Sequence, residues 1–532
     1  MAYAVEPQIF TQFKGIRQLN GVSSGGVISA VKSNNVELIQ SEMGAETGIK
    51  TMAGNKIIYS LPTGYKVIGI FQSVQDGVTY KFIYGENASQ GKLFYVNLQD
   101  ELVAVDGAPN FQLSGDCNGI TMTSTAYDVF VFTNGKTFTV SSNTYSFISV
   151  CFARGSAQND TTVHNIKAKD KDNHTLTFLS MTDWNGFLVI ADQYGVHGSK
   201  QLDIETWNYS STGAADSWSF PMGKKATAVY SYTGGLYIFT ADDITYLTDS
   251  PNISSSSAQT VAGLGCFSYQ SILKHDTFLF FYDNKQKNIY YLQNIDVGQI
   301  RPAGPVAREI QAYFATVEKF KMFSCIFENK NQVWCLINDK IFIYDYFQQE
   351  WIQRSEQPLN SVCLIQNNVF SGGNDGQVYA EFIQEDFSGS YYPADYQTAF
   401  INLGTYSNIK KQKTPLLIVL NDNYVNDFYV QLTVNGKTKN PKHIKISTNA
   451  GGVYAREDDY VGEIVPDYSI YDNDAAIYAP DNVYHKKVVE VSTPQTWYTM
   501  GIRFYTTDPK QGFFINSIEL KNIKMKNKTK GR

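Results

Sequence analysis

Apolar and polar residues follow a two-strand pattern along most of the chain, and residues 331–351, NQVWCLINDKIFIYDYFQQEW, show it clearly. In VWCLI, Val333 and Trp334 point to opposite sides of a strand, so both of its faces are apolar. Asn338 and Asp339 then favour a tight turn, and IFIYDY returns with two apolar faces. Because a strand that is apolar on both faces is covered on both, the stretch predicts a buried β-hairpin.

The same pattern recurs along the chain. Six further stretches pair two apolar strands around a short polar turn, at residues 80–98, 127–140, 185–200, 234–249, 276–293 and 367–382. Successive hairpins begin 36 to 58 residues apart. A four-stranded propeller blade takes roughly 40–50 residues and lies between two neighbours, so the pattern predicts a six- or seven-bladed β-propeller. Stacked β-sandwiches would give a similar density of hairpins, but their strands should alternate apolar and polar positions more cleanly.

One stretch between two predicted blades has a helical pattern. In residues 300–320 the apolar side chains Val306, Ile310, Phe314 and Val317 recur at helical spacing. We predict a helix here, as a decoration on the propeller.

The pattern changes after residue 382. A polar stretch at 385–397 is typical of a linker, and longer strands without the blade interval follow at 415–420, 427–434, 443–447, 487–492, 499–507 and 513–523. Residues 457–481 are acidic and Tyr-rich and are predicted to form an exposed loop. The chain is therefore predicted to be all-β in three regions: an N-terminal arm with the first strands over 1–64, the β-propeller over 65–383, and a C-terminal β-sandwich-like domain with a basic tail over 384–532.

The composition agrees with a large β protein and argues against one class of binding partner. The 532 residues are 43% hydrophobic and 14% aromatic, which is ample for a large core. The 36 Tyr and 33 Phe suit a pleated, half-buried surface. A formal net charge of −6 is mild and argues against a dedicated nucleic-acid binder, which usually carries a strong basic excess.

The cysteines and the lengths of the apolar runs indicate the kind of cellular compartment in which the chain folds. The six cysteines stand at positions 117, 151, 266, 325, 335 and 363; none forms a C-x-x-C pair or lies at metal-ligand spacing from a histidine. We predict buried, reduced thiols. Residues 1–20 have no apolar core of signal-peptide length, and the longest apolar runs, such as 278–282, are too short to span a membrane.

Patterns that resemble catalytic motifs occur in the wrong context. GVSSG at 21–25 matches G-x-S-x-G, but no buried strand precedes it, so a Gly/Ser loop is predicted. AGLGCF at 262–267 has two glycines of a dinucleotide loop and lacks the third. STNAGGVY at 447–454 fits the box of sialidase-like hairpins, which folds a turn and is not catalytic. Neither a G-K-[ST] phosphate loop nor an H-E-x-x-H motif occurs.

Titratable residues also show no convergent pattern. The six histidines, at 164, 174, 197, 275, 443 and 485, are scattered, and each is predicted to be a surface or a satisfied core residue. A glycosidase needs two carboxylates that flank a sugar, whereas Asp242, Asp243 and Asp283 lie in predicted hairpin turns. YDYFQQEW at 344–351 is similar to a kelch element, but the paired glycines of kelch repeats occur only at 234–235 and 372–373. We expect no catalytic residue, no metal ligand and no cofactor.

The order of these features resembles one family, the tail hub or nozzle proteins of short-tailed bacteriophages, which includes packaged-DNA stabilisation proteins. The resemblance is strongest over residues 232–382, where GGLYIFTADDITYLTD, GLGCFSYQSILKHDTFLFFYDNKQKNIYYL, GQIRPAGPVAREIQAYFA, IFIYDYFQQEWIQR and NNVFSGGNDGQVYAEF follow one another. ISTNAGGVYARED and GIRFYTTDPKQGFFINSIELKNI are similar to the end of the family's chains. Residues 1–70 match only loosely, and the ordered set carries the resemblance, since no single motif is diagnostic.

The resemblance implies a structural virion protein and no enzyme. Copies of the chain would form a ring, a hexamer, below the portal and adaptor proteins of the phage tail, after assembly in the host cytoplasm. The ring would enclose the channel that double-stranded DNA crosses without sequence specificity, help to retain packaged DNA, and bind fibres, spikes or a plug. The family's functional surfaces are interfaces, so no individual residue carries over. A mild negative charge suits such a conduit, because Lys and Arg contacts to phosphates would hold the DNA.

An alternative comes from another class, a carbohydrate-binding or carbohydrate-cleaving propeller such as a phage receptor-binding protein. A tail hub should form a ring of fixed stoichiometry and lack hydrolase activity. A glycan-cleaving enzyme should show carboxylates that converge in one pocket.

Overall fold

The computed structural model describes most of the chain. The described residues are 2–5, 8–16, 22–23, 27–40, 47–124, 127–152, 161–193, 195–293, 302–327, 330–354, 359–383, 392–403, 408–421, 424–446, 486–508 and 510–526. Their regular secondary structure is almost wholly β-strand; the helices among them are two 3-10 segments, η1 (Tyr269–Ser271) and η2 (Arg308–Phe314). The predicted all-β class is therefore confirmed.

The chain divides into two compact units, each described by itself below. Unit 1 comprises Met1–Gly54, Gln348–Ser355 and Gln384–Arg532, and unit 2 comprises Asn55–Phe347 and Glu356–Ile383. The predicted boundaries are wrong at the N-terminal side. Residues 1–54 do not form a separate arm, because their strands pair with C-terminal strands in unit 1, and residues 55–60 already form a strand of unit 2.

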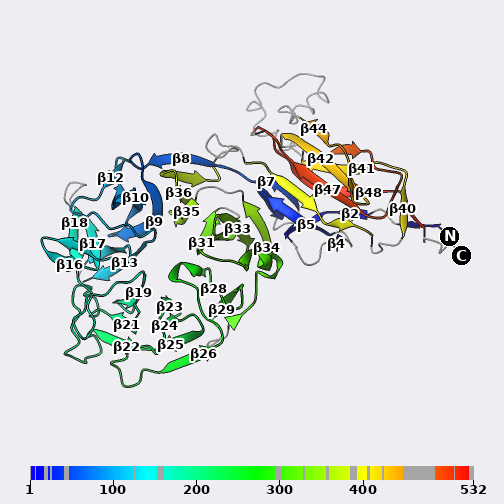
Figure 1. Ribbon diagram of the computed structural model, residues 1–532. Coiled ribbons are helices and arrows are strands. Elements are labelled where there is room, and N and C mark those ends of the chain that lie inside the picture. Colours follow the sequence, from blue (N-terminus) through cyan, green and yellow to red (C-terminus); the bar gives the residue numbers. More distant parts are fainter. Residues whose placement is uncertain are drawn as a thin grey trace, which may run out of the picture. The chain divides into compact units, whose positions relative to one another are not determined.

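Unit 2 is a succession of small antiparallel sheets, which follow one another in chain order around a common centre (Figure 1). Its described sheets are β9 (Lys66–Gln75), β10 (Val78–Glu86), β11 (Gly91–Val96) and β12 (Leu102–Ala104); β13 (Asn118–Ser124), β14 (Tyr127–Thr133), β17 (Phe147–Phe152) and β18 (Thr161–Ile166); β19 (Ser180–Trp184), β20 (Phe187–Ala191), β21 (Gly195–Gly198) and β22 (Trp218–Pro221); β23 (Ala228–Tyr232), β24 (Gly235–Phe239), β25 (Asp243–Leu247) and β26 (Ala258–Ala262); β27 (Ile272–His275), β28 (Phe278–Asp283), β29 (Asn288–Gln293) and β30 (Pro302–Ala303); β31 (Phe320–Phe327), β32 (Lys330–Ile337) and β33 (Lys340–Asp345); and β35 (Leu359–Ile365), β36 (Asn368–Gly373), β37 (Gln377–Glu381) and β8 (Asn55–Ser60).

The first strands of successive sheets contact one another at the centre of unit 2. β9 contacts β13, β13 contacts β19, β19 contacts β23, β27 contacts β31, β31 contacts β35, and β35 contacts β9. The last sheet contains β8, which comes from the start of the unit and pairs with β37 between Asn55↔Glu381 and Ser60↔Gln377. The series of sheets therefore closes on itself, and its last sheet joins both ends of the unit.

Aromatic side chains fill the space between successive sheets, which explains why the middle strands are apolar on both faces. Between the first two sheets, Phe82 stacks on Phe130 with ring centroids 4.1 Å apart, and Tyr80 stacks on Phe152 at 3.9 Å. Such pairs bury large apolar areas and add specific ring geometry.

Six of the seven predicted hairpins are present as the middle strands of these sheets, and the one at 127–140 is wrong. β14 pairs with β17, whereas β15 (Phe138–Val140) pairs with β16 (Asn143–Tyr145) in a separate two-stranded sheet. The turn between β14 and β15 is bound to residues outside the hairpin, because the buried Asn134 donates hydrogen bonds to Gln112 O at 2.6 Å and to Tyr84 Oη at 3.1 Å.

The predicted helix at 300–320 is also wrong in extent, because only η2 forms there. Pro302 and Pro305 lack the backbone N–H that a helix needs, and Pro302 belongs to β30. At the other end, Asn338 Oδ1 accepts hydrogen bonds from Glu318 N at 2.9 Å and Lys319 N at 3.1 Å. The apolar positions Ile310 and Phe314 are nevertheless fully buried.

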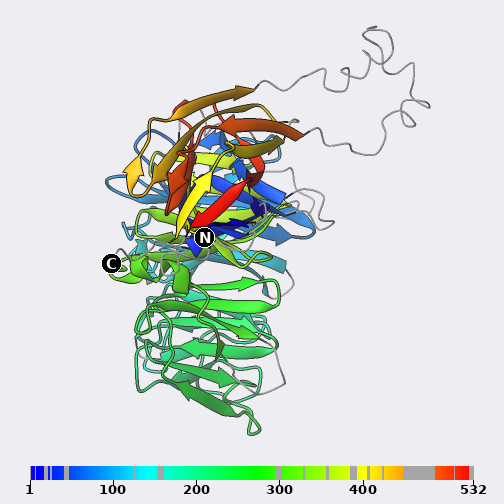
Figure 2. The same cartoon turned by 90° about the vertical axis from the view of Figure 1, so that its right-hand side faces the viewer.

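Unit 1 interleaves strands from both ends of the chain, so that blue and red strands lie side by side (Figure 2). Its strands pair in three groups: β1 (Ala2–Val5), β49 (Ile523–Lys526), β40 (Ile409–Gln412) and β46 (Thr496–Trp497); β45 (Lys486–Val491), β41 (Leu416–Asn421), β48 (Phe514–Leu520), β7 (Thr47–Thr51), β6 (Val36–Gln40) and β2 (Gln8–Phe10); and β34 (Glu350–Arg354), β5 (Val27–Asn34), β3 (Gln12–Ile16), β38 (Asp395–Thr398), β47 (Met500–Tyr505), β39 (Phe400–Ile401), β4 (Val22–Ser23), β42 (Asn426–Val434), β43 (Lys437–Thr438) and β44 (Lys442–Ile446). All six strands predicted after residue 414 are confirmed. The predicted acidic loop at 457–481 lies outside the described residues.

Candidate functional site

A pocket lies at the centre of the sheets of unit 2. It has a volume of about 490 Å³, and each of the seven first strands contributes to its wall; the contributors include Ile68, Asn118, Ser180, Val229, Ile272, Lys321 and Asn360. One strand from each sheet therefore forms a single pocket.

Few charged groups line the central pocket. Among the described residues of its wall, Asp183 is the one carboxylate, and Lys274 and Lys321 are the cations. Lys321 is almost fully buried and lies 3.5 Å from Asp116 Oδ1. Partial desolvation beside the wall raises the pKa of Asp183, although the residue is exposed to solvent and a 3.1 Å hydrogen bond from Gly186 N opposes this effect. A single carboxylate does not provide the acid and base pair that glycoside hydrolysis requires.

The thiol and phenol groups of the pocket are kept protonated by burial. Burial raises the pKa of Cys117 far above its usual range, and a thiol that stays protonated is a poor nucleophile. Burial likewise raises the pKa of Tyr269, whose hydroxyl donates to Cys117 O at 3.0 Å. Neither group is activated for nucleophilic or acid–base chemistry.

Short polar side chains of the wall bind the neighbouring sheet. Ser180 Oγ accepts a hydrogen bond from Val229 N at 2.8 Å, and Ser361 Oγ accepts one from Ile70 N at 3.0 Å. Thr182 Oγ1 likewise accepts a hydrogen bond from Ser231 N, whereas Asn118 and Asn360 donate from Nδ2 to the carbonyl oxygens of Leu179 and Val67. These hydrogen bonds join the first strand of one sheet to that of the neighbouring sheet, so the polar groups of the wall have a structural role.

Sequence reasoning missed these polar residues. The available signal was a Ser, Thr or Asn within the first strand of a blade. Its partner could not be read from the sequence, because Ser180 and Val229 are 49 residues apart and Ser361 and Ile70 are 291 apart.

A second cavity, of about 570 Å³, lies on unit 2 beside Tyr127, His164, Asp203 and Glu205. It holds two carboxylates, and both have local partners. Asp203 accepts hydrogen bonds from Thr206 Oγ1 at 2.7 Å and Glu205 N at 3.2 Å, while Glu205 pairs with His164 Nδ1 at 2.7 Å. Tyr127, which lines this cavity, is half exposed.

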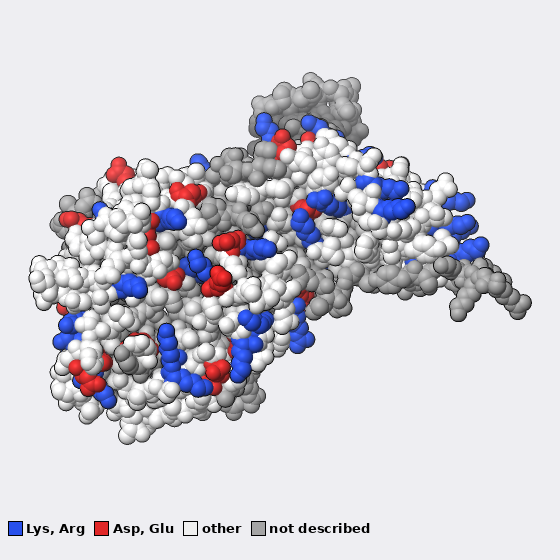
Figure 3. Space-filling model, viewed as in Figure 1, with Lys and Arg blue, Asp and Glu red and all other residues white. Residues whose placement is uncertain are grey.

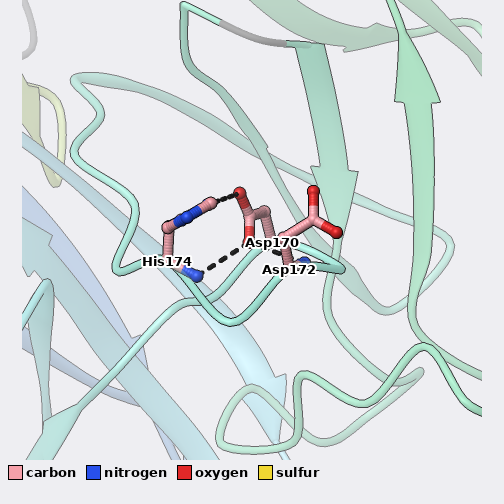
Figure 4. A group of neighbouring side chains, drawn as sticks. All are labelled: Asp170, Asp172 and His174. Atoms are coloured by element: carbon pink, nitrogen blue, oxygen red, sulfur yellow. Dashed lines mark hydrogen bonds and ion pairs between the residues drawn. The ribbon is translucent and has the colours of Figure 1, made fainter.

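Asp170, Asp172 and His174 form the one group of potential metal ligands found among the described residues (Figure 4). The three belong to one tight turn, in which Asp170 accepts hydrogen bonds from the backbone N of Asp172 and of His174, at 2.9 and 2.8 Å, and from His174 Nδ1 at 2.8 Å. Burial acts to raise the pKa of Asp170, but these bonds outweigh it and lower the pKa. These hydrogen bonds stabilise a local turn, and we assign no metal to the three residues.

The structure places the other predicted motifs in structural roles. GVSSG includes β4, and the next described element is the strand β5 (Val27–Asn34) instead of a helix. In AGLGCF, Gly265 lies so close to the backbone of Ala241 that a Cβ would be 2.3 Å from its carbonyl carbon. STNAGGVY lies outside the described residues.

The predicted turn carboxylates also have structural partners. The buried Asp283 accepts hydrogen bonds from Gly265 N at 2.7 Å and Gln286 N at 2.6 Å. Asp243 pairs with Lys224 at 2.5 Å, and Asp242 lies 3.5 Å from Lys285 Nζ.

The described histidines each have a polar neighbour, although the buried His197 keeps an Nδ1 without a hydrogen-bond partner and so departs from the prediction of a satisfied core residue. His164 pairs with Glu205, His174 with Asp170, His197 with Asp192, His275 with Ser324 and Asn331, and His443 with Asp427, while His485 lies outside the described residues. None of these neighbours is a second histidine or a cysteine.

All six cysteines are free, and the prediction of reduced thiols agrees with this. Cys117, Cys266, Cys325 and Cys335 are buried, whereas Cys151 and Cys363 are only partly buried, which corrects the prediction that all are core residues. Burial raises the pKa of Cys266 to about 12.

Comparison with known proteins does not assign a family. No family model matches the chain, and no curated protein matches it. Among solved structures, the computationally designed Ika8 protein shares 12% identity at a TM-score of 0.33, covering 62% of this chain and 100% of its own. BamB from Moraxella catarrhalis shares 11% identity at a TM-score of 0.35, covering 67% of this chain and 99% of its own. These values leave the function of this chain open.

Proposed function

We propose that unit 2 is a seven-bladed β-propeller, that unit 1 is a sandwich-like β domain, and that the protein is a structural component instead of an enzyme. The closure of the sheet series by β8, which joins residues 55–60 to 377–381, supports the propeller. The central pocket carries the proposal of a structural role, because its polar side chains bind neighbouring strands and a single carboxylate, Asp183, lines its described wall.

The proposed role is that of a tail hub in a short-tailed phage. Copies of the chain form a ring below the portal and adaptor, enclose the DNA exit channel, retain packaged DNA, and attach fibres, spikes or a plug. The ordered resemblance over residues 232–382 supports this role. The chain departs from the family where a helix-bearing insert is expected, because only the 3-10 helix η2 stands there.

Two physical features agree with this role. The formal charge of −6 suits a passage that DNA must leave, because phosphate contacts from Lys and Arg produce tight, salt-dependent binding. In the described part of the chain, no helix combines the length and apolar character that crossing a membrane requires.

The test combines the purified protein with the virion. Native mass spectrometry should give one ring of fixed stoichiometry, and virions should contain the protein in the tail. Particles made without the gene should lose their packaged DNA or lack a complete tail. Particles that keep both would overturn the proposal.

The cavity beside Tyr127 favours a second candidate, a glycan-binding or glycan-cleaving propeller. Its two carboxylates belong to Asp203 and Glu205. If the protein hydrolyses a polysaccharide and either Asp203→Asn or Glu205→Gln abolishes the activity, this candidate replaces the structural one. The structural proposal expects no hydrolysis by the wild type, and equal glycan binding by wild type and variants.

A further inference from the structure

One exposed sheet face in unit 1 is unusually rich in lysine. In the sheet β1-β49-β40-β46, Lys524 and Lys526 stand two residues apart on β49, and Lys411 on β40 is directly opposite Lys524. Side chains two residues apart on a strand, or opposite each other across a pair, share one face. All three lysines are exposed. We call this surface, defined by Lys411, Lys524 and Lys526, the lysine face.

The opposite side of the same sheet is the buried one. Gln412, Ile523, Met525 and Trp497 are all at most 5% exposed. The alternation of buried and exposed residues along β40 and β49 therefore fixes the register, and the three lysines cannot turn inward without exposing this core.

The lysine face carries an electrostatic cost that no ion pair among the described residues of unit 1 offsets. Like charges directly opposite each other destabilise an antiparallel pair, and Lys411 faces Lys524 in this way. No ion pair joins the three lysines to a carboxylate within the described part of unit 1. The neighbouring Lys521, by contrast, pairs with Glu519 at 2.7 Å. Figure 3 shows Lys and Arg side chains gathered over the end of unit 1 where Figure 1 labels β40, with few acidic ones among them.

The sequence adds basic residues after β49 and contains an acidic stretch of complementary charge. Lys528, Lys530 and Arg532 follow directly after β49. The same unit contains an acidic stretch at 457–481, with Glu457, Asp458, Asp459, Glu463, Asp467, Asp472, Asp474 and Asp481 and no Lys or Arg. A basic and an acidic segment of one chain have complementary charge when two copies meet head to tail.

We propose that the lysine face of one copy binds the acidic stretch 457–481 of a second copy. The proposal rests on the ring of the proposed function and names the contact that joins neighbouring copies. A second copy is favoured over nucleic acid because the complementary charge is part of the same chain, whose net charge is negative. The repulsion between Lys411 and Lys524 is then relieved on assembly.

A charge-swap experiment tests this contact. One variant reverses the face (Lys411→Glu with Lys524→Glu). Another reverses the stretch by placing five lysines beside its three remaining acidic residues (Glu457→Lys, Asp458→Lys, Asp459→Lys, Glu463→Lys and Asp467→Lys). Each variant alone should self-associate at least about tenfold more weakly than wild type in native mass spectrometry and sedimentation. Mixing the two should restore association, because the reversed face meets the reversed stretch and the unchanged face meets the unchanged stretch.

Two control variants distinguish this contact from a general effect of charge and from misfolding. Lys437→Glu with Lys439→Glu changes the same charge at two exposed positions of unit 1 away from the face, and should leave association as in wild type. The neutral variant Lys411→Gln should raise the melting temperature, because it removes the repulsion, and still weaken association. A variant that merely failed to fold would not melt at a higher temperature.

Several outcomes would overturn the proposal. A wild type that stays monomeric would remove the ring itself. Association of both reversed variants as strong as that of wild type would refute this contact and leave the ring standing. No restoration on mixing would mean that any pairing of face and stretch occurs within one copy. Loss of binding to a labelled DNA duplex in the face variant, with self-association unchanged, would assign the face to nucleic acid instead.

Discussion

At the scale of single residues, Gly15 sets the distance between two strands of unit 1. It lies in β3 against the backbone of Trp351 in β34, where a Cβ on Gly15 would be 2.2 Å from the carbonyl oxygen of Trp351. Gly15 N also donates a hydrogen bond to Glu350 Oε2 at 3.1 Å. Because the close neighbour is backbone, no side chain can rotate away to make room.

We predict that Gly15→Ala lowers the free energy of unfolding by about 1–3 kcal/mol, the usual cost of overpacking. Denaturant titration followed by tryptophan fluorescence measures the effect. Gly223→Ala is the matched control, because a Cβ there meets nothing within 4 Å. It should change stability by less than about 0.5 kcal/mol. Equal effects of the two substitutions would contradict the close contact.

His275 makes the stability of unit 2 depend on pH. Its buried ring hydrogen-bonds Ser324 Oγ at 2.8 Å and also Asn331. Burial lowers the pKa of His275, although the bond to Asn331 opposes this. An unfolded histidine titrates near about 6.5, so below that pH the unfolded state binds the proton first and stability falls as the pH drops.

The wild type should therefore lose more stability than His275→Gln when the pH falls from about 7 to about 5. Unfolding free energies of both proteins at each pH measure the difference. Above about pH 7 the two curves should run parallel, because the ring is then neutral in both states. Parallel curves down to pH 5 would show that the ring is protonated in the native state.

At the scale of elements, two adjacent residues of β8 contribute to the sheet through their backbone, while Tyr59 of the same strand packs in the core. The side chains of Lys56 and Ile57 are both exposed, so their contribution to the sheet is the ladder with Ala380 and Tyr379 on β37. In an antiparallel pair, adjacent residues alternate in whether their N–H points to the partner strand. Replacing both residues with proline therefore removes at least one ladder hydrogen bond whichever way the strand is turned.

We predict that the double variant Lys56→Pro with Ile57→Pro lowers the stability of unit 2 by about 3 kcal/mol or more, the scale of a misplaced proline. Lys56→Ala with Ile57→Thr keeps both N–H groups and should cost less than about 1 kcal/mol. Hydrogen exchange of β37 amides reads out the ladder directly, and unchanged protection in the proline variant would show that β8 does not pair there.

The elements differ in how far the sequence predicts them. Middle strands such as β32, with Val333 and Trp334 on opposite faces, are predictable because burial of both faces makes consecutive residues of the strand apolar. β8 is not, because its partner Gln377 stands 317 residues from Ser60. The helix at 300–320 was wrong because apolar spacing does not report that Asn338 binds the N–H groups of Glu318 and Lys319. The central pocket could not be predicted for the same reason as the pairing of β8. Its wall combines one strand from each sheet, and these strands lie far apart in the sequence.

At the scale of the whole molecule, the state of the thiols tells whether disulfides stabilise the fold. All six cysteines are free, and four are buried. We predict that the protein prepared without reductant shows six reactive thiols in denaturant, and that the native protein reacts far more slowly with a thiol-reactive disulfide. Cys151 and Cys363 should react first, because they are only partly buried. Fewer than six thiols in denaturant would reveal a covalent bond between copies.

The pairing of β8 with β37 has a consequence for synthesis on the ribosome. Residues 55–60 leave the exit tunnel long before their partner at 377–381 has been made. At about 5–20 residues per second the strand waits on the order of 15–60 s with its hydrogen-bonding edge open. Through that interval the nascent chain carries an unpaired β edge, which is a template for pairing with another nascent chain. Ribosomes spaced closely on one message would thus expose identical edges to one another, and the yield of folded protein should fall as translation initiates more often.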